Sequence, residues 1–461
     1  MATQALKCER HGELTRLTCV DCGKPICPKC WVRTEVGLKC EDDATPAAIN
    51  EKALAMMRPS KRPLYLGIAG AVLAVALIVV LTSRDDGGEQ AAPPQPPVGT
   101  WRQAPALATI RGTASAVVLN DGRVLVAGGG VGAIPIREAE LFDPMAGQWQ
   151  ATGPLNEARR GHAATILADG RVLITGGRDV DGEPSAEAEI YDPATGAWSL
   201  TAPMPLGRIG HSLTLLADGR VLVAGGTSRG AAGATGGQTV APDSSAELFD
   251  PRTGSWTATT SMRSARFEHT ATALPDGKVL IAGGQGPDSS GRFVALSSTE
   301  LYDPAADGFV SSSDLGEART NHAAVLLTDN SSVLIMGGAG GTNADISLNS
   351  AELFDSRSGT WTRVGPLNLG RTGHTATLLA DGRVLVAGGE SAQRGQRRSL
   401  RTGEVYDPNT AEWRSAGDME CPRSEHAAVV LGDGTVLVVA GDAAFPGQNP
   451  LAQGCADRYQ P

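Results

Sequence analysis

From residue 100 to the C-terminus, short apolar runs alternate with polar turn residues in a unit that recurs about every 50 residues. One copy, residues 162–177, reads HAATILADGRVLITGG, which is two apolar runs separated by Asp-Gly. This pattern is typical of a β-hairpin, and we expect a type I′ turn because Asp-Gly tolerates positive φ angles. A third apolar run carries Glu-Leu-Phe-Asp-Pro, and a fourth carries an aromatic residue. Each unit therefore predicts four antiparallel strands.

Six copies of the unit share residues at fixed spacing. The motif E-[LIV]-[FY]-D-[PS] begins at Glu140, Glu189, Glu247, Glu300, Glu352 and Glu404. The aromatic residue of the fourth run is Trp149, Trp198, Trp256, Phe309, Trp361 or Trp413. The motif R-x-x-H then supplies His162, His211, His269, His322, His374 and His426. A four-stranded unit that repeats in this way predicts the blades of a β-propeller, because only neighbouring blades bury its faces.

The two ends of the repeat region complete one another. Trp101 stands at the spacing of a fourth-strand tryptophan, and Arg111 follows it with Ala114 in place of the histidine. The C-terminal residues 456–461, ADRYQP, are a degraded third-strand motif. We therefore predict seven blades. The last blade takes three strands from the C-terminus and one from the N-terminus, which closes the ring and removes free edges.

The repeat resembles the kelch family, through Gly-Gly, then Tyr/Phe-Asp-Pro, then Trp, then Arg-x-x-His. The sequence motif D-G-R-V-L-V-A-G-G is also similar to the propeller of galactose-oxidase-like proteins. That resemblance implies a copper site of tyrosine, histidine and a cysteine–tyrosine cross-link. The tyrosines of this region, Tyr191, Tyr302, Tyr406 and Tyr459, occupy repeat positions, and none of its histidines lies outside R-x-x-H. We therefore expect no enzyme and no catalytic residue in the propeller.

Residues that recur in every copy are expected to be scaffold, with the histidines hydrogen-bonded at blade junctions and the tryptophans packed between blades. Function is expected where the copies differ. The variable segments follow Gly-Gly and join the second strand to the third, so all should emerge on one face of the ring. They are residues 130–139, 178–188, 227–246, 285–299, 339–350 and 390–403. The alternative is that these segments are idle and disordered.

A cysteine-rich head occupies residues 1–43. Its candidate ligands form four pairs: Cys8 and His11, Cys19 and Cys22, Cys27 and Cys30, and Cys40 and Asp43. Such pairs suit two tetrahedral Zn²⁺ sites, and metal would stabilise a segment with little core. The spacing resembles the B-box type of zinc-binding domain. The resemblance implies one site of Cys8, His11, Cys27 and Cys30 and another of Cys19, Cys22, Cys40 and Asp43, where the aspartate departs from the usual His or Cys. It also implies protein–protein contact.

Residues 64–81, LYLGIAGAVLAVALIVVL, contain no charge and would form a helix of about 27 Å. We predict one transmembrane helix at 64–82, after a linker at 44–63. Arg58, Lys61 and Arg62 precede the helix, which places the N-terminus in the cytoplasm and the propeller in the periplasm or outside the cell. The Pro- and Gly-rich residues 83–95 should form an extended stalk, and the propeller fills 96–461.

Charge and the remaining cysteines refine this picture. Residues 63–461 hold 29 Lys+Arg and 42 Asp+Glu, a net charge of −13. An acidic domain argues against nucleic acid as a partner. Cys421 and Cys455 should lie on one face of the last blade, and a disulfide between them is expected outside the cytoplasm, with two free thiols as the alternative.

The sequence thus predicts an all-β, seven-bladed propeller with a small zinc domain and one membrane helix. The favoured function is a single-pass membrane adaptor whose propeller binds a protein or glycan and whose zinc head contacts a protein in the cytoplasm. An exported propeller enzyme acting on carbohydrate is the first alternative, and it lacks copper ligands and an acidic cluster. A cytoplasmic regulator whose apolar helix has been misread is the second.

Overall fold

The computed structural model describes residues 96–229, 240–341, 345–393, 396–442 and 454–461, together with four short strands of the head. The chain divides into two units, Met1–Ala91 and Ala92–Pro461. In the first unit the strands are β1 (Leu6–Lys7), β2 (Leu14–Thr15), β3 (Trp31–Thr34) and β4 (Gly37–Cys40), paired as two hairpins. None of the described segments contains a helix long and apolar enough to cross a membrane. The predicted linker, membrane helix and stalk, 44–95, lie outside the described residues.

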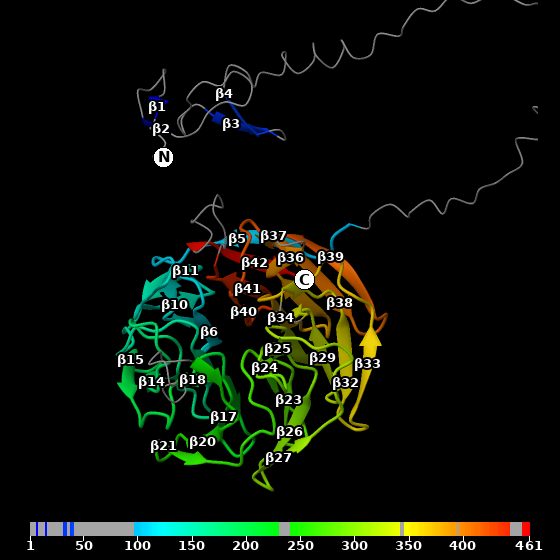
Figure 1. Ribbon diagram of the computed structural model, residues 1–461. Coiled ribbons are helices and arrows are strands. Elements are labelled where there is room, and N and C mark those ends of the chain that lie inside the picture. The colour runs from blue at the N-terminus through cyan, green and yellow to red at the C-terminus, as the bar shows by residue number, and fades with distance from the viewer. Residues whose placement is uncertain are drawn as a thin grey trace, which may run out of the picture. The chain divides into compact units, whose positions relative to one another are not determined.

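The second unit is a ring of seven four-stranded antiparallel sheets, as predicted (Figure 1). Blade 1 contains β6 (Ser115–Val118), β7 (Val124–Ala127), β10 (Ala139–Asp143) and β11 (Gln148–Ala151). Blade 2 contains β12 (Ala163–Ile166), β13 (Val172–Thr175), β14 (Ala188–Asp192) and β15 (Ala197–Leu200). Blade 3 contains β16 (Ser212–Leu215), β17 (Val221–Ala224), β20 (Ala246–Asp250) and β21 (Ser255–Ala258). Blade 4 contains β22 (Thr270–Ala273), β23 (Val279–Ala282), β26 (Thr299–Asp303) and β27 (Gly308–Ser311).

The remaining blades complete the ring. Blade 5 contains β28 (Ala323–Leu326), β29 (Ser332–Met336), β32 (Ala351–Asp355) and β33 (Thr360–Val364). Blade 6 contains β34 (Thr375–Leu378), β35 (Val384–Ala387), β38 (Thr402–Asp407) and β39 (Glu412–Asp418). Blade 7 contains β40 (Ala427–Val430), β41 (Val436–Val439), β42 (Ala456–Gln460) and β5 (Thr100–Ala104).

The ring closes through the two chain ends, as the sequence predicts. β5 pairs antiparallel with β42, and Trp101 lies opposite Tyr459 with ring centroids 5.0 Å apart. The Tyr459 hydroxyl donates to the carbonyl of Val98 at 2.6 Å. Figure 1 shows β5 and β42 side by side at the seam. The pairing completes blade 7 as a four-stranded sheet like the other six.

The apolar runs of the sequence fill the spaces between blades. The second strand of each blade is buried along its whole length, as in β7 and β13. Side chains from adjacent blades share one cluster: Leu125 of blade 1 packs with Ile174 and Tyr191 of blade 2. Each blade therefore gains its apolar burial from its neighbours, which is why the repeat is stable only as a ring.

The turn between the first two strands differs from the prediction. In blade 1, Leu119 N donates to Arg123 O and Gly122 N donates to Leu119 O, which makes a three-residue loop. Gly122 has φ of 85°, whereas Asp121 is not among the residues with positive φ. The predicted type I′ turn, which needs two such residues, is wrong. The Asp121 carboxylate instead accepts the Arg123 N–H at 3.0 Å, a local bond that favours this longer turn.

The repeated arginines and acids are scaffold. Each arginine of the motif is fully buried and forms an ion pair at 2.5–3.0 Å with the acid of its own blade, such as Arg319 with Glu352 or Arg423 with Asp457. Its Nη1 also donates to two carbonyls, in blade 5 those of Gly337 and Ser350. These bonds tie the loop that enters a blade to the second and third strands.

Candidate functional site

The repeat histidines join neighbouring blades, as predicted. Nε2 of each of five histidines lies 2.8–2.9 Å from a hydroxyl of the preceding blade: Ser115–His162, Thr175–His211, Ser212–His269, Thr270–His322 and Thr375–His426. Burial lowers the pKa of His162 and His211 to about 3. These histidines are therefore neutral structural groups at physiological pH.

The repeat aromatics pack between neighbouring blades, as predicted, and also contact an aromatic residue of their own blade. Trp198 lies against Tyr191 of the adjacent strand, with ring centroids 5.0 Å apart. Its Nε1 donates to the carbonyl of Gly153 in the previous blade at 2.9 Å. Trp198 also shares an apolar cluster with Leu125 and Leu141 of the previous blade, so the predicted contact between blades is present. The described tyrosines thus pack in the core.

The described parts of the variable segments form hairpins, as expected for segments that join the second strand to the third. The hairpins are β8 (Gly130–Val131) with β9 (Ile134–Pro135), β18 (Thr227–Arg229) with β19 (Val240–Pro242), β24 (Gln285–Pro287) with β25 (Phe293–Ala295), β30 (Ala339–Gly340) with β31 (Ile346–Ser347), and β36 (Glu390–Gln393) with β37 (Gln396–Ser399). In blade 2, Arg178 and Pro184 form a single antiparallel bridge. We call the surface built by these segments the loop face. Some of its hairpins contact the next along the ring: Ser347 of blade 5 donates to the carbonyl of Glu390 of blade 6 at 3.1 Å.

Apolar side chains gather on the loop face. Of the nine large hydrophobic side chains that are exposed in the described residues, five belong to these segments: Val131, Ile134, Val180, Phe293 and Ile346. Ile134 is 70% exposed and Ile346 is 55% exposed, both near hairpin tips. These side chains are available for apolar contact with a partner.

A second feature lies at the centre of the same face. The residue two positions after each repeat arginine has a positive φ, between 48° and 65°. We call these seven residues the axial ring: Thr113, Gly161, Gly210, Glu268, Asn321, Gly373 and Glu425. Each lies two residues before the innermost strand of its blade. The axial ring therefore surrounds the propeller axis at the end that carries the loop face.

Backbone hydrogen bonds link the axial ring from blade to blade. The N–H groups of Glu268, Asn321, Gly373 and Glu425 each donate to the carbonyl of the ring residue in the preceding blade, at 2.8–3.2 Å. The residue just before each ring residue forms a β-bridge with the start of its blade's variable segment, as Phe267 does with Gln285. The hairpins and the axial ring are therefore one continuous surface.

Two carboxylates occupy the axial ring. Asn321 donates from Nδ2 to Oε1 of Glu425 at 2.7 Å, and the Thr320 hydroxyl lies 3.4 Å from Oε2 of Glu268. Both glutamates are open to solvent, yet seven blades converge around them. This crowding, together with the charge of Glu425, raises the pKa of Glu268 to about 7. Crowding raises the pKa of Glu425 as well.

The axial ring was missed in the sequence, although a signal is present. In R-x-x-H the second x is glycine in three copies and Glu, Asn or Glu in the three others. A position that takes glycine in half its copies indicates a positive φ, and a glutamate there is unusual. The copies therefore differ inside the motif as well as after Gly-Gly.

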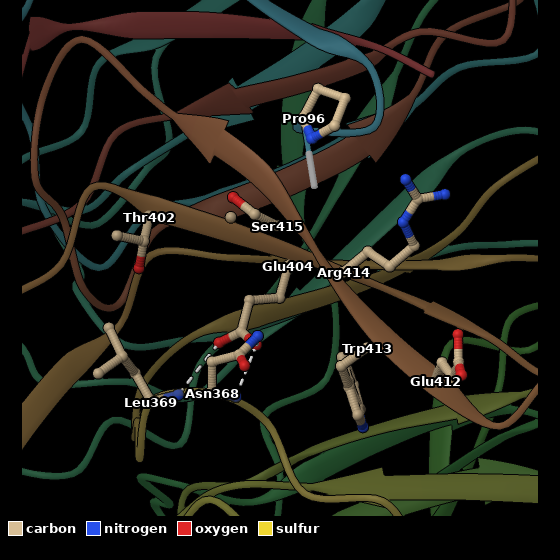
Figure 2. A pocket seen from close by; sticks show the side chains of 10 residues that line it. Pro96, Asn368, Leu369, Thr402, Glu404, Glu412, Trp413, Arg414 and Ser415 are labelled. Carbon is tan, nitrogen blue, oxygen red and sulfur yellow. Dashed lines mark hydrogen bonds between the residues drawn. The ribbon is translucent and has the colours of Figure 1, made fainter. Parts of the chain in front are cut away.

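A cavity of about 440 Å³ lies at the seam where Pro96 enters beside blade 6 (Figure 2). Its central carboxylate, Glu404, accepts two bonds from Asn368 and is paired with Arg371 at 2.6 Å. The Glu404 carboxylate is thus already satisfied by the scaffold.

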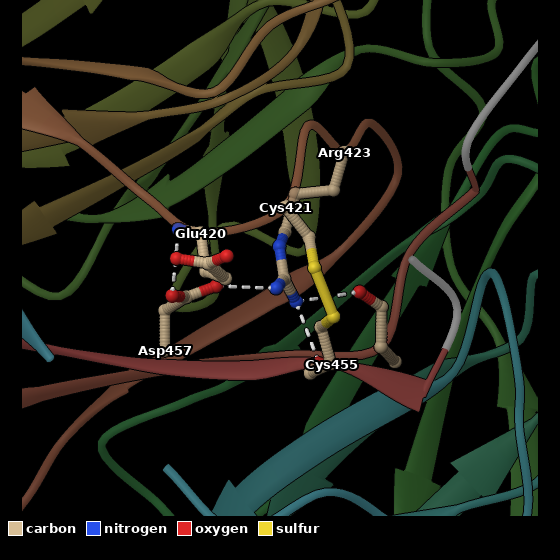
Figure 3. Close-up of a disulfide and its surroundings, with 6 residues drawn as sticks. Glu420, Cys421, Arg423, Cys455 and Asp457 are labelled. Atoms are coloured by element: carbon tan, nitrogen blue, oxygen red, sulfur yellow. Dashed lines mark hydrogen bonds and ion pairs between the residues drawn. A yellow bond between two sulfur atoms is a disulfide. The ribbon is translucent and has the colours of Figure 1, made fainter. Parts of the chain in front are cut away.

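The structure joins Cys421 and Cys455 as a disulfide with Cα atoms 6.5 Å apart (Figure 3). Cys421 lies in the loop that enters blade 7, and Cys455 directly precedes β42. Arg423 donates to the carbonyl of Cys455 at 2.9 Å and pairs with Asp457 at 2.5 Å. The bond therefore stands beside the scaffold ion pair of the blade that closes the ring.

The candidate zinc ligands Cys8, His11, Cys19, Cys22, Cys27, Cys30 and Asp43 lie outside the described residues, and only the backbone of Cys40 is placed, in β4. Elsewhere in the described residues, no group of three or more His, Cys, Asp and Glu side chains is arranged to hold a metal ion. By donor chemistry, thiolates with one imidazole or one carboxylate suit zinc.

Comparisons with known proteins agree with this architecture. Residues 102–346 match the Attractin/LZTR1 beta-propeller model, 268–451 match the KLHDC2/KLHL20/DRC7 Kelch-repeats domain, and 3–35 match the B-box zinc finger. The B-box match includes six of the candidate ligands and stops before Cys40 and Asp43, and it suggests zinc binding.

Similar curated proteins include Kelch-like protein 36 of Mus musculus, 27% identical over 42% of this chain and 30% of its own length. Alpha-scruin of Limulus polyphemus is 28% identical over 42% of this chain and 21% of its own length. The chain thus matches less than a third of these relatives. Among solved structures, a fungal alcohol oxidase of the AA5 family in complex with copper aligns with a TM-score of 0.60 and 18% identity, over 79% of this chain and 76% of that one, which shows a shared fold.

Proposed function

We propose, on the premise that this chain belongs to the Attractin/LZTR1 family of kelch-type β-propellers, that it is a single-pass membrane adaptor whose loop face binds a protein partner. The zinc head makes a second protein contact in the cytoplasm, and the propeller works in the periplasm or outside the cell. The observation that carries the binding role is the gathering of five exposed apolar side chains on one face. A glycan would favour polar and aromatic groups, whereas four of these five side chains are aliphatic.

The membrane part of the proposal rests on the uncharged run 64–81 and the basic residues before it. A reporter enzyme that is active only outside the cytoplasm, fused after Pro461, tests it. Activity of the fusion supports the proposed topology. Activity of a cytoplasm-restricted reporter in the same place supports instead a cytoplasmic regulator.

The binding part is tested by capture of partners from membranes with the full chain in detergent. The double substitution Ile134→Ser with Phe293→Ser removes two exposed apolar contacts from the loop face. Met145→Ser is the matched control, since Met145 is 95% exposed in a turn on the opposite face. Partners that are lost with the first variant and kept with the control support the loop face; equal capture by both variants contradicts it.

An exported enzyme of the copper-oxidase type is the alternative class. We infer that the propeller is not one, because the described histidines join blades and the described tyrosines pack against aromatic residues of the fourth strands. Oxidation of galactose by the full chain after copper loading would overturn this inference.

For the head we propose two Zn²⁺ ions, one held by Cys8, His11, Cys27 and Cys30 and one by Cys19, Cys22, Cys40 and Asp43. The B-box match supports the first set, and metal would supply much of the folding free energy of so small a segment.

A further inference from the structure

Many acidic side chains near the loop face and in the scaffold pair with a cation, whereas the two in the axial ring do not. Every repeat acid pairs with a buried arginine, and Glu390 pairs with Arg397 at 3.0 Å. Asp442 lies 3.9 Å from Arg160. Within the described residues, Glu268 and Glu425 have no Lys, Arg or His in ion-pair range, and their recorded side-chain partners are Thr320 and Asn321.

This arrangement costs the folded protein free energy. Two carboxylates that repel one another, in a crowded setting without a cation, are less stable than the same groups in water. Glu268 and Glu425 also hold φ angles of 52° and 50°, which glycine adopts more easily. Nothing in the scaffold requires the two acids, since glycine occupies the same place in blades 2, 3 and 6.

The other groups that face these carboxylates leave a net negative charge. Asp442 and Glu390 raise the pKa of Glu425, and Arg160 lowers it. Glu425 in turn raises the pKa of Glu268. Arg160 is partly occupied, because its Nη1 donates to the carbonyl of Gly132 at 2.8 Å. The centre of the loop face therefore attracts a positive group.

The apolar surface lies beside this charge and not apart from it. Phe267, next to Glu268, meets Phe293 of the β24–β25 hairpin edge to face, with centroids 6.5 Å apart. The axial ring is also open at blade 2, because a Cβ added to Gly161 would meet nothing within 4 Å. At Gly373, by contrast, it would lie 2.5 Å from Oε1 of Glu425. Space for an entering side chain thus exists on one side of the carboxylates.

We propose that the partner of the loop face is a protein segment that places a lysine or arginine side chain against Glu268 and Glu425, with flanking apolar residues on Ile134, Phe293 and Ile346. This proposal rests on the loop face being the binding face. Charge complementarity at the centre and apolar contact at the rim together fix the chemistry of the segment. A basic side chain supplies the cation that the two carboxylates lack.

The proposal has a pH dependence. Lysine and arginine stay charged up to pH 8, whereas Glu268 ionises near its raised pKa of about 7. Binding should therefore strengthen as the pH rises from 5.5 to 8, and Glu268→Gln should remove most of that change. Asn321 and Thr320, the other groups in contact with the carboxylates, do not titrate.

The test uses the full chain in detergent micelles and a random library of 12-residue peptides on phage, selected at pH 8. We expect the selected peptides to carry Lys or Arg flanked by apolar residues. For the best peptide, the double variant Glu268→Gln with Glu425→Gln should weaken binding by about tenfold or more, as expected for loss of a charge-assisted contact. Asp345→Asn, an exposed acid between β30 and β31, is the matched control and should bind as the parent does. Melting temperatures establish that the variants fold.

The outcomes distinguish the basic nature of the partner from the role of the loop face as the binding face. Selected peptides that are neutral or acidic, or a tight peptide unaffected by the double variant, overturn the basic partner. If that peptide is still lost with Ile134→Ser and Phe293→Ser, the loop face stands as the binding face. If no peptide is enriched, or if Ca²⁺ alone displaces the peptide at micromolar concentration, the inference is also rejected. Partner capture by the apolar variants then decides the proposed function separately.

Discussion

His426 of blade 7 shares a hydrogen bond with Thr375 of blade 6, with 2.8 Å between Nε2 and Oγ1. Four other junctions repeat this link, whereas His374 meets no hydroxyl because blade 5 has Ala323 and Met336 at the two available places. At the junction of blade 7 with blade 1, Ala427 and Val439 occupy the two positions where other blades have a hydroxyl, and Ala114 replaces the histidine. Both the hydroxyl and the histidine are therefore missing at the seam, whereas only the hydroxyl is missing between blades 5 and 6.

The first prediction concerns this junction. Thr375→Val should lower the free energy of unfolding by about 1–3 kcal/mol, because it leaves the buried His426 ring without its partner. Ala323→Ser should raise it by about 1 kcal/mol by giving His374 a hydroxyl. Urea denaturation of the full chain measures both. Equal stability of Thr375→Val and the parent would contradict a structural role for the histidine.

The repeat tryptophans should matter for stability and not for recognition. Trp198→Ala should cost about 3 kcal/mol, since Trp198 is 9% exposed and packs on Tyr191. Trp149→Ala, at a more exposed copy, should cost less. Thermal melts combined with partner capture test this, and a variant that is fully stable but fails to bind would refute it.

Reduction should weaken the seam of the ring. The bond between Cys421 and Cys455 spans a separation of 34 residues, for which the chain-entropy model gives about 3–4 kcal/mol. The double variant Cys421→Ser with Cys455→Ser should melt at lower temperature and lose the sensitivity of the propeller to dithiothreitol. Peptide mapping after thiol labelling of the native protein supplies the direct readout. Labelling of both cysteines before reduction would show that they are free.

Acid should destabilise the propeller through its histidines. The pKa of His162 is about 3 in the folded chain and near 6.5 when unfolded, so the unfolded state binds more protons between these values. The stabilisation is complete above pH 6.5 and is lost as the pH falls toward 3. His162→Gln should be less stable than the parent at pH 7.5, and the gap should narrow at pH 5. A gap in the urea midpoint that stays constant with pH would speak against a buried neutral ring.

The head should bind two zinc ions, with Asp43 as a ligand of the second. Asp43→Asn should weaken one of the two sites, while Asp42→Asn, a change of the adjacent carboxylate, should leave both intact. Metal content after dialysis and a zinc-indicator titration give the stoichiometry and the affinity. A single ion in the parent, or equal affinities in the two variants, would remove Asp43 from the set.

The fold was predictable because its determinants repeat. Six copies of Gly-Gly and seven of the buried arginine make the strand pattern unambiguous, so even the shared blade at Trp101 and Tyr459 followed from spacing alone. The hairpin turn was misjudged, because Asp-Gly is compatible with two turn types and the choice depends on a side-chain bond of Asp121. The centre of the loop face was missed for another reason. Glu268 and Glu425 are far apart in sequence and meet only when the ring closes, and the motif that contains them suggested pure scaffold.

The pairing of β5 with β42 also bears on how the protein is made. Blades 1 to 6 each come from one continuous stretch, so their strands can pair as soon as that stretch has been synthesised. Blade 7 must wait for β42, and until then the strand that holds Trp101 has no partner. In a chain that is threaded through a membrane, the ring would close only after β42 has crossed. Truncation before β42 would therefore act like the loss of a whole blade.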